Sequence, residues 1–597
     1  MYGFHARLLH IDLTAQSYEW QGIAEARLQA FLGGIGLGTA LLYDFTPSDI
    51  EPFSPANPLI FTSAPLVGTA LTTTAKYAVV TKSPLTGFIA DSLSSSFFAL
   101  ELKRTGLDAL VITGRATQPI YLWVTDNTVE FRDARKLWGK SPQETEEAIR
   151  DALQDPEIRI AAIGQAGENR VRYATLSNEG RHAGRGGIGA IFGSKNLKAV
   201  ALRGHHPTPV ADKDGVEKIA RTLRERSVGP ATAKYREIGT VANLSVFNRL
   251  GSLPTRNFQH STFSHAEALS GETLVANSFS RVHGCASCTI RCERLFRSMD
   301  GDEQRLEYET LFALGPLCGI QQPEDVLQAA RLCDQYGLDT ISTGGTLAWA
   351  MECAEKGLLS EARDAGLTFG NAAAVLTTIA DIANRKGLGA LLADGSRRAA
   401  AQIGTAAEHF AIQVKGMELP GYEPRSLKTM ALGLAVSPRG ACHNRSGAYE
   451  ADFSGQVDRL QADAGRGALV VASEDFAAVL DSLIVCKFLR KCFDDFYSEA
   501  AILLSHVTGW QFSGGDLKRV GERVNTLKKL FNMRAGWQPD DDWLPPRLLN
   551  EPLSSGVAQG VRLTPDELRI MIQGYYEARG WDKDGSVSTG KKIELGL

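Results

Sequence analysis

The sequence predicts an α+β protein in which a β-rich N-terminal domain is followed by two mainly helical domains. Up to about residue 208, short runs rich in β-branched and aromatic residues are separated by Gly, Pro, Asn and Asp, which is typical of strands and turns. Beyond that point Ala, Leu, Glu and Arg dominate, and apolar residues recur at helical spacing. A length of 597 residues allows roughly three or four domains.

Several runs carry the strand pattern of the first domain. Ala78–Thr81, Ala109–Thr113 and Ile120–Val124 are the clearest of them, and Lys198–Leu202 looks similar. Residues 1–13 also alternate like a strand, and they lack the charged-then-apolar plan of a signal peptide. These runs indicate a β-rich domain that covers residues 1–208.

The helical part divides near residue 415, before the turn-rich run Lys415–Gly421. Helical spacing is visible in two sets of apolar residues, which are Val326, Leu327 and Ala330, and Ala372, Ile379 and Ala383. We therefore expect one helical domain over residues 209–415 and another over residues 416–597.

Composition limits the class of protein. With a net charge of −4, the chain has no generally basic surface for nucleic acid. No apolar run reaches about 18 residues, so no transmembrane helix is expected. Nine cysteines are an odd number and three of them cluster, which argues against a disulfide framework and favours a reducing cytoplasm.

The most specific motif is a run of three cysteines. Cys285, Cys288 and Cys292 have CxxCxxxC spacing, and Cys486 is a remote fourth candidate. Three close thiolates and one distant thiolate suit a cubane iron–sulfur cluster, which is held by four cysteines. Structural zinc is the alternative, although four-cysteine zinc sites usually contain two CxxC pairs. A cluster in a chain of this size indicates electron transfer.

Glycine-rich stretches occur at Gly33–Gly38 and Ala183–Ala190, where backbone N–H groups could approach a phosphate closely. The second stretch contains a formal GxGxxG pattern. A dinucleotide fold needs a strand before these glycines and a helix after them, whereas Ser177–His182 looks like a polar loop. The glycines therefore serve either a phosphate contact outside such a fold or tight turns.

Two further runs contain candidate proton-transfer groups. Glu307 and Glu309 shortly follow the cysteine run and could include a general base, although paired acids are more often solvated or ion-paired. In Ser437–Arg445, His443 follows a Pro and a Gly and is flanked by arginines, which suits an anionic or polar ligand. A purely structural histidine is the alternative.

Two related patterns, Asp334–Asp339 and Asp481–Cys486, both begin with Asp and have an apolar middle. A carboxylate can accept two N–H bonds from a fused amidine-like ring, such as a pterin. The second Asp lies close in sequence to a proposed cluster ligand, so a ring ligand and the cluster would be neighbours, as electron transfer requires. Two helix segments with coincidental acids are the alternative.

Taken together, these residues resemble the tungsten-containing aldehyde:ferredoxin oxidoreductase family over nearly the whole chain. The matching motifs, in order, are Thr81–Gly87, Gly164–Asn169, Ala183–Gly189, Gly193–Lys198, the CxxCxxxC run, Gly337–Ser342, Ser437–His443 and Asp481–Phe488. So many motifs in one order make chance similarity improbable.

The resemblance implies a saddle-like β-rich base that two mostly helical domains cover. It also implies a tungsten atom held by the dithiolenes of two pterins, with molybdenum as the alternative metal, and a [4Fe–4S] cluster beside one pterin. A Mg²⁺ ion would bridge the pterin phosphates. The cluster ligands carry over to Cys285, Cys288, Cys292 and Cys486.

The resemblance further implies a set of pterin contacts. These positions are Lys76, Leu93, Ala183, Gly184, Arg185, Asp334, Leu338, Asp339, Arg445, Asp481 and Val485. Ala183 matches a position whose backbone carbonyl helps hold the magnesium ion.

Three positions depart from the family pattern. The family often has Arg at Lys76, and lysine keeps the charge but loses the planar fork of donors. Leu93 replaces an asparagine, so only its backbone carbonyl could bind magnesium. Ile484 stands where glycine is common.

The resemblance implies oxidation of a small aldehyde and water to a carboxylic acid, with two electrons released. Glu309 is the first choice for the base that activates water or the hydrated substrate, and His443 would hydrogen-bond the substrate oxygen. Ferredoxin or a ferredoxin-like small subunit would take the electrons, and a homo-oligomer or a larger complex fits this role. The alternatives are a related reduction of an aromatic acyl thioester or a carboxylic acid, and a non-catalytic iron–sulfur subunit.

Overall fold

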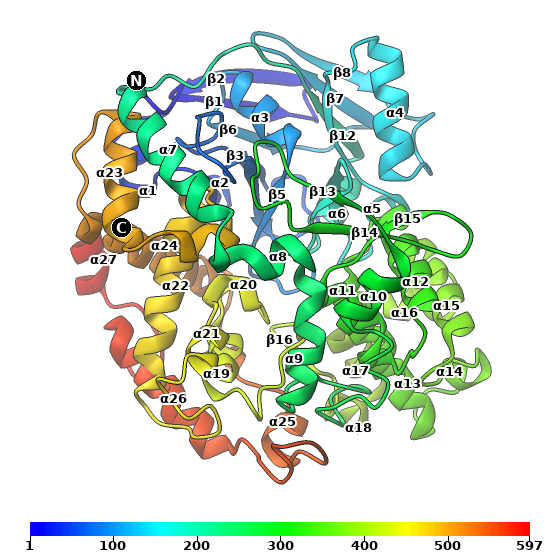
Figure 1. Cartoon of the computed structure of the whole chain (residues 1–597). Coiled ribbons are helices and arrows are strands. Elements are labelled where there is room, and N and C mark those ends of the chain that lie inside the picture. The colour runs from blue at the N-terminus through cyan, green and yellow to red at the C-terminus, as the bar shows by residue number, and fades with distance from the viewer.

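The computed structural model describes residues 1–597 and has a β-rich N-terminal part followed by a mainly helical part, as predicted (Figure 1). One six-stranded sheet has the order β2-β1-β6-β3-β4-β5, with strands β1 (Arg7–Asp12), β2 (Ser17–Gly22), β3 (Leu59–Thr62), β4 (Lys76–Lys82), β5 (Ile89–Ser95) and β6 (Ala109–Thr113). The other has the order β11-β10-β9-β12-β7-β8, with strands β7 (Ile120–Val124), β8 (Val129–Asp133), β9 (Arg159–Ala162), β10 (Leu176–Asn178), β11 (Arg181–Ala183) and β12 (Leu197–Leu202). The clearest predicted strands are β4, β6 and β7, and all are confirmed.

The two sheets share one apolar core. Most of their strand pairs are antiparallel, and β1–β6 and β7–β12 are parallel. The ring of Phe61 lies 6.0 Å from that of Tyr77 on the same sheet and 6.1 Å from that of Phe192, which follows β11. Both sheets bury side chains in this cluster, so they form one β-rich body.

The glycine-rich stretch after β11 corrects a local prediction. Ser177–His182, interpreted as a polar loop, forms the β10–β11 hairpin, and helix α6 (Ile188–Ser194) follows it. The polar residues tolerate a strand because they bond one another, as Ser177 Oγ and His182 Nδ1 do at 2.7 Å. β11 is an edge strand in an antiparallel pair, so the stretch is still outside the parallel unit of a dinucleotide fold.

The remaining helices lie mostly after residue 208. The N-terminal part also contains α1 (Glu25–Phe31), α2 (Gly34–Phe45), α3 (Phe97–Arg104), α4 (Pro142–Leu153) and α5 (Gln165–Glu168). The middle of the chain contains α7 (Lys213–Ser227), α8 (Ala233–Glu237), α9 (Asn243–Arg249), α10 (Gly271–Ser278), α11 (Tyr308–Leu314), α12 (Pro323–Tyr336), α13 (Thr340–Glu355), α14 (Ser360–Asp364), α15 (Ala372–Asn384), α16 (Leu388–Leu392), α17 (Ser396–Ile403) and α18 (Thr405–Glu408). The last part contains α19 (Lys428–Val436), α20 (His443–Ser446), α21 (Tyr449–Phe453), α22 (Arg466–Leu483), α23 (Phe496–Thr508), α24 (Gly514–Arg534), α25 (Pro546–Asn550), α26 (Pro565–Arg579) and α27 (Thr589–Leu595). Division into units at residues 208 and 415 stays a prediction.

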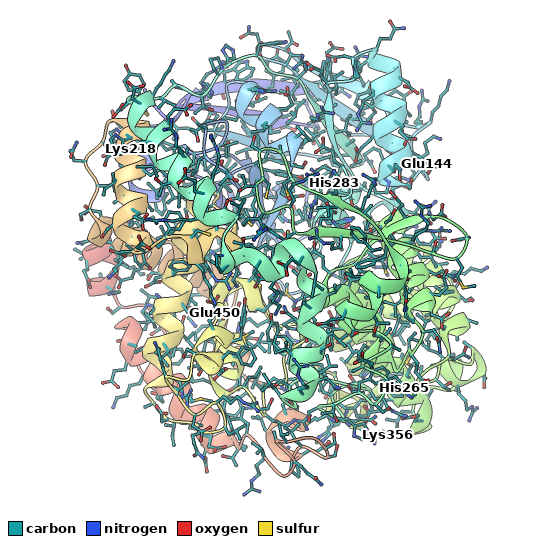
Figure 2. The ribbon with its side chains drawn as sticks, in the orientation of Figure 1. Glu144, Lys218, His265, His283, Lys356 and Glu450 are labelled. Carbon is teal, nitrogen blue, oxygen red and sulfur yellow. The ribbon has the colours of Figure 1, made fainter.

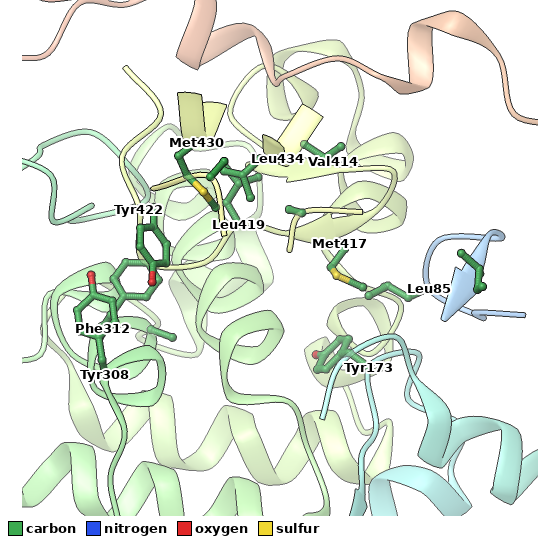
Figure 3. Close-up of a cluster of buried hydrophobic side chains, with 14 of the residues drawn as sticks. Leu85, Tyr173, Tyr308, Phe312, Val414, Met417, Leu419, Tyr422, Met430 and Leu434 are labelled. Carbon is green, nitrogen blue, oxygen red and sulfur yellow. The ribbon is translucent and has the colours of Figure 1, made fainter. Parts of the chain in front are cut away.

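The helical parts and the β-rich part meet in a large continuous core. Figure 3 shows Leu85, from the turn between β4 and β5, beside Met417, and Tyr173 nearby. On the other side of this view, Tyr308, Phe312 and Tyr422 form an aromatic group, with 6.4 Å between the rings of Tyr308 and Phe312. Segments far apart in sequence thus share one interior, which fixes their relative positions.

A small sheet projects from the helical part across the β-rich part (Figure 1). Its antiparallel strands are β13 (Phe279–His283), β14 (Glu293–Arg297) and β15 (Glu303–Arg305). The loop between β13 and β14 contains all three clustered cysteines, and β15 leads directly to α11. A two-stranded ladder, β16 (Gln413–Val414) and β17 (Met417–Glu418), follows near the end of the middle part.

Charged side chains cover the exterior. Figure 2 shows Glu144, Lys218 and Lys356 pointing outward, and all three are exposed. No single helix is both long and apolar enough to cross a membrane, and only the pair α1 and α2, bent by 119°, meets the criteria of length and composition together.

Gly187→Ala is expected to destabilise the chain far more than Gly180→Ala. The two glycines have similar positive φ values of 75° and 71°, where alanine costs about 1–2 kcal/mol. A Cβ atom at Gly187 would lie 2.0 Å from the carbonyl oxygen of Arg172, whereas Gly180 has no atom within 4 Å. The clash should add roughly 3 kcal/mol or more. Thermal melts of the two variants measure this difference, and equal melting temperatures would contradict it.

Candidate active site

The turn between α12 and α13 holds two predicted pterin-binding acids against the β-rich part. Asp334 lies in the last turn of α12, and Asp339 caps α13 by accepting bonds from the N–H groups of Ile341 and Ser342, both at 3.3 Å. Gly337 joins them in the left-handed conformation at φ 75°, and its carbonyl accepts from the N–H of Thr175 at 2.8 Å. The turn is therefore fixed by backbone bonds to the N-terminal part.

These acids face a cavity of about 240 Å³. Its wall comes from the ends of β4 and β5, the β11 hairpin, the segment from β15 to α11, and the α12–α13 turn. The pairing of Lys76 with Ser95 and of Ala78 with Leu93 between β4 and β5 sets which side chains reach it. The cavity lies where the β-rich part meets the middle helices.

Seven of the predicted site residues line this cavity, namely Lys76, Leu93, Gly184, Glu309, Asp334, Leu338 and Asp339. The others outside the cysteine set are buried but do not line it, namely Ala183, Arg185, His443, Arg445, Asp481 and Val485. Arg185 is nevertheless joined to the wall, because its Nε donates to Asp339 Oδ2 at 3.1 Å.

Two consecutive threonines bring the cysteine run and Cys486 to the same region. Thr72 Oγ1 accepts from the N–H of Thr289, inside the run, at 3.1 Å. The carbonyl of Thr73 accepts from the N–H of Cys486 at 3.1 Å. Cys285 Sγ also lies 3.2 Å from Ser95 Oγ at the end of β5. The predicted cluster ligands thus converge beside the cavity.

Lys76 is the cation among these groups. Burial lowers its pKa, but the nearby Cys486, Asp481, Cys285 and Cys292 raise it overall. No set of three or more His, Cys, Asp and Glu side chains is close enough to hold a single metal ion.

Glu309 and His443 form a buried pair whose facing atoms have no partner. Glu309 lies in the first turn of α11, and its Oε2 accepts from the N–H of Gly421 at 2.9 Å. Its Oε1 lies 3.6 Å from His443 Nδ1, and neither atom has a hydrogen-bond partner. The ring of Tyr422 stacks on that of His443 at 5.3 Å and orients it. Buried polar atoms are rarely left unpaired, so a polar ligand that contacts both atoms would satisfy them.

Burial shifts the pKa values of this pair in opposite directions. It raises the pKa of Glu309 to about 7, despite the lowering by the Gly421 N–H and Arg185. It lowers the pKa of His443 well below 6.5, and Lys487 and Arg185 lower it further. Near neutral pH, His443 is uncharged and Glu309 exchanges its proton readily, which suits a general base.

A second group of charged side chains surrounds Asp91 of β5. The Asp91 carboxylate accepts from Arg445 Nε at 3.0 Å and from Lys528 Nζ at 2.5 Å, and its backbone carbonyl accepts from Arg445 Nη2 at 2.7 Å. Arg445 also donates to Asp481 Oδ2. Although burial opposes it, these cations hold the pKa of Asp91 far below its usual range. Asp91 therefore ties β5 to α20 and α24.

Sequence reasoning missed several charged residues of this region. Arg181, His182 and Arg305 line the cavity, and Lys528 contacts Asp91 from α24. Arg181 and His182 lie in the hairpin that was interpreted as a loop. Its turn, Glu179–Gly180, has positive φ at both residues, and a two-residue turn ending in Gly was the available signal. No local pattern pairs Lys528 with Asp91.

Comparison with known proteins identifies the family. A family model described as the N-terminal domain of aldehyde ferredoxin oxidoreductase matches residues 8–204, and one described as domains 2 and 3 matches residues 215–597. The chain belongs to the aldehyde ferredoxin oxidoreductase family. This confirms the predicted family and the oxidoreductase class.

The chain matches known relatives over nearly their full lengths. The chain is 38% identical to a tungsten-containing aldehyde ferredoxin oxidoreductase of Pyrococcus abyssi, covering 100% of this chain and 99% of that protein. It is 31% identical to the WOR-like subunit of an aliphatic sulfonate oxidoreductase of Pyrococcus furiosus, covering 100% and 97%. It also resembles one chain of the active-site complex BamBC of benzoyl coenzyme A reductase with 1,5-dienoyl-CoA, with a TM-score of 0.84, 25% identity and coverage of 100% of this chain and 97% of that chain. A tungsten-containing family of this kind implies a tungstopterin and typically an iron–sulfur cluster.

The residues around the cavity fit such a pterin group in their chemistry. Asp334 and Asp339 each keep acceptor capacity for ring N–H donors, because a carboxylate has about four lone-pair sites. Gly184 presents open backbone, since an added Cβ would meet only His182 at 3.9 Å, and Arg181 and Arg305 supply positive charge. The cavity is smaller than the range of about 300–1,000 Å³ for ligand pockets.

Asp91→Asn is expected to destabilise the cofactor-free chain by about 3–5 kcal/mol, because it leaves buried Lys528 without its carboxylate and leaves buried Arg445 with Asp481 alone. Since the pKa of Asp91 is depressed, this contribution is present at neutral pH and disappears only as pH falls through the native pKa. Thermal melts at neutral pH measure the loss. Asp133→Asn, at an exposed ion pair with Arg135, is the control and should change little. A variant at Asp91 that melts like this control would contradict the expectation.

Proposed function

We propose that this chain oxidises aldehydes to carboxylic acids and passes two electrons to a small iron–sulfur protein. The observation that carries the proposal is the buried Glu309–His443 pair, whose unpartnered atoms face one another at 3.6 Å beside the predicted cofactor cavity. A base with a pKa of about 7 and a neutral donor suit the addition of water to a carbonyl group. Membership of the family supports the same reaction.

The proposed cofactors are supported by the family and by the residues around the cavity. A bound tungsten bis-pterin would supply the two-electron acceptor and a Lewis acid. Asp334, Leu338, Asp339 and Gly184 would hold one pterin, and the remaining proposed contacts are Lys76, Arg185, Arg445, Asp481 and Val485. The backbone carbonyls of Leu93 and Ala183 would help hold a Mg²⁺ ion. Cys285, Cys288, Cys292 and Cys486 would hold a [4Fe–4S] cluster.

Glu309 acts as the general base. Its Oε2 is fixed by the Gly421 N–H, so Oε1 alone is free to take a proton from water or from the hydrated aldehyde. Burial keeps the protonated and ionised forms close in free energy near pH 7, which allows Glu309 to accept a proton and release it again in each turnover.

His443 positions the substrate oxygen. Its Nδ1 faces Glu309, and the stacked ring of Tyr422 restricts rotation of the imidazole. Because burial and nearby cations keep the imidazole neutral, one ring nitrogen donates and the other accepts. A neutral donor can hold a carbonyl oxygen without surrendering its own proton to Glu309.

A related reduction is the second candidate. The structural neighbour is a chain of a benzoyl coenzyme A reductase complex with 1,5-dienoyl-CoA, and the match covers 97% of that chain. The same paired acid and histidine could deliver protons to an acyl thioester or a carboxylic acid if electrons arrive from a carrier. Assays of aldehyde oxidation with a viologen acceptor, beside thioester reduction with a reduced viologen, distinguish the two reactions.

Glu309→Gln is expected to lower kcat for aldehyde oxidation by about 100-fold or more with tungsten and iron retained, because the amide cannot take a proton. In the parent enzyme, kcat/KM should rise with pH around a midpoint of about 7, since only ionised Glu309 is a base. Viologen-linked rates across pH, with metal analysis of each sample, measure both effects.

Glu303→Gln on β15 is the matched control, because Glu303 pairs with Arg281 at the surface. It should leave the rate and its pH profile unchanged. Near-normal turnover of the Glu309 variant with a full metal content would remove Glu309 from this role.

Anaerobically purified chain from cells supplied with tungstate and molybdate is expected to contain about one tungsten and four irons. Cys486→Ser should lose iron, because it removes one of the four thiolates, whereas Cys353→Ser, inside α13, should keep it. Mass spectrometry of metals gives the ratios. Iron without tungsten or molybdenum would favour a non-catalytic electron-transfer subunit, and zinc without iron would overturn the cluster assignment.

A further inference from the structure

Lys487, in the segment between α22 and α23, ends in a buried ammonium group that has no hydrogen-bond partner. Other buried lysines of the helical part are neutralised. Lys415, Lys528 and Lys529 each pair with an aspartate, at 2.7, 2.5 and 3.0 Å. An ammonium group offers three donors, and burying it without an acceptor costs free energy. The charge of Lys487 is therefore not compensated by the chain itself.

The Lys487 ammonium lies one helical turn from His443. α20 begins at His443, and the N–H of Gly447 at its end donates to the His443 carbonyl at 3.0 Å. A Cβ atom at Gly447 would lie 3.3 Å from Lys487 Nζ. Residues four apart on a helix are neighbours, with about 5–6 Å between their Cβ positions. Burial lowers the pKa of His443 most, and Lys487 is the first of the charged groups that lower it further, which agrees with this proximity.

A row of aromatic rings runs beside the two groups. The ring of Tyr422 stacks on His443 at 5.3 Å, and the ring of Tyr449 on α21 stacks on Tyr422 at 4.8 Å. Lys487 Nζ lies 4.9 Å from the centre of the Tyr449 ring. The next ring, that of Phe453, is 6.5 Å from Tyr449 and is 36% exposed, so the row reaches the surface. Such rings pack well against the carbon atoms of a ligand that has polar groups at its two ends.

The other charged groups near Lys487 have partners of their own. Arg490 Nε lies 2.7 Å from an oxygen of Glu450, which Figure 2 labels. Asp452 accepts from two backbone N–H groups of α19. Although Lys487 follows the proposed cluster ligand Cys486, it does not line the cofactor cavity. An anion from outside the chain is therefore the natural partner of this ammonium.

We infer that Lys487 binds the carboxylate of an aldehyde substrate whose carbonyl group faces His443 and Glu309, so that ω-oxo acids are the preferred substrate class. The inference rests on the proposed function, because that function places the carbonyl group at His443. A carboxylate carries a single charge, whereas a phosphate carries nearly two and costs more to bring among aromatic rings. One ω-oxo acid and one water give one dicarboxylic acid, two protons and two electrons, and the electrons pass to the same acceptor as for any other aldehyde.

The test compares kcat/KM for 4-oxobutanoate, 5-oxopentanoate and 6-oxohexanoate with the values for their methyl esters, in viologen-linked assays of the holoenzyme. The parent should prefer at least one of these acids over its ester by about 10- to 100-fold, as expected for a hydrogen bond between charged groups. Lys487→Met should remove this preference, chiefly through a higher KM for the acid. Lys487→Arg, which keeps the charge, should retain most of it.

Lys491→Met is the matched control. Lys491 is exposed in the same segment, and its replacement removes the same charge, so the preference for the acid should stay at the parent value. Equal values for acids and esters in the parent, or a preference that survives Lys487→Met, would overturn the anion subsite. Loss of tungsten or iron from Lys487→Met, measured on every sample, would assign Lys487 to cofactor binding and also overturn it.

Equilibrium binding separates this inference from the proposed function. Pentanedioate, the product expected from 5-oxopentanoate, should bind the holoenzyme about tenfold more tightly than its monomethyl ester in calorimetric titrations. Lys487→Met should abolish this difference. If the parent oxidises no aldehyde but the difference is present and depends on Lys487, the proposed function fails while the anion subsite stands. Equal affinities in the parent would contradict the subsite directly.

Discussion

The buried guanidinium of Arg185 is the interaction on which the arrangement of the site depends. Its Nε donates to Asp339, its Nη2 to the carbonyl of Glu418 and its Nη1 to the carbonyl of Ala441. One side chain from the β-rich part thus contacts the start of α13, the β17 segment and the residue two before His443. A buried charge must be fully hydrogen-bonded to be tolerated, so these three segments cannot move independently. The spacing between Asp339 and His443 follows from this constraint.

Local patterns made much of the fold predictable. Strand runs such as Ala109–Thr113 and helix sets such as Val326–Ala330 carry their periodicity in a few residues. The β10–β11 hairpin escaped prediction because its polar side chains are satisfied by one another and by Asp334, which lies far away in sequence. Tertiary contacts of this kind leave no periodic signal in the strand itself.

The candidate site was predictable where chemistry is encoded in spacing, as in the cysteine run and the Asp334–Asp339 turn. It was not predictable where partners are distant, as for Asp91 and Lys528, which are 437 residues apart. Two departures from the family pattern, Leu93 and Ile484, also lie at the same apolar cluster. Ile484 caps α22 at φ 62°, a conformation that favours glycine, and it packs in a small apolar cluster that Leu93 also contacts. Leu93 and Ile484 thus place apolar surface against the same small cluster.

The small sheet has a consequence for assembly of the protein. The cysteine loop, β14, β15 and Glu309 follow one another in a single segment, in which β14 is paired on both sides. The conformation of the cysteine loop and the position of Glu309 are therefore linked through a few strand residues. A chain whose loop collapses, for example after oxidation of its thiols, would lose the placement of Glu309 as well. Under the proposed function, a chain that loses the cysteine loop would therefore lose the proposed cluster and the proposed general base together.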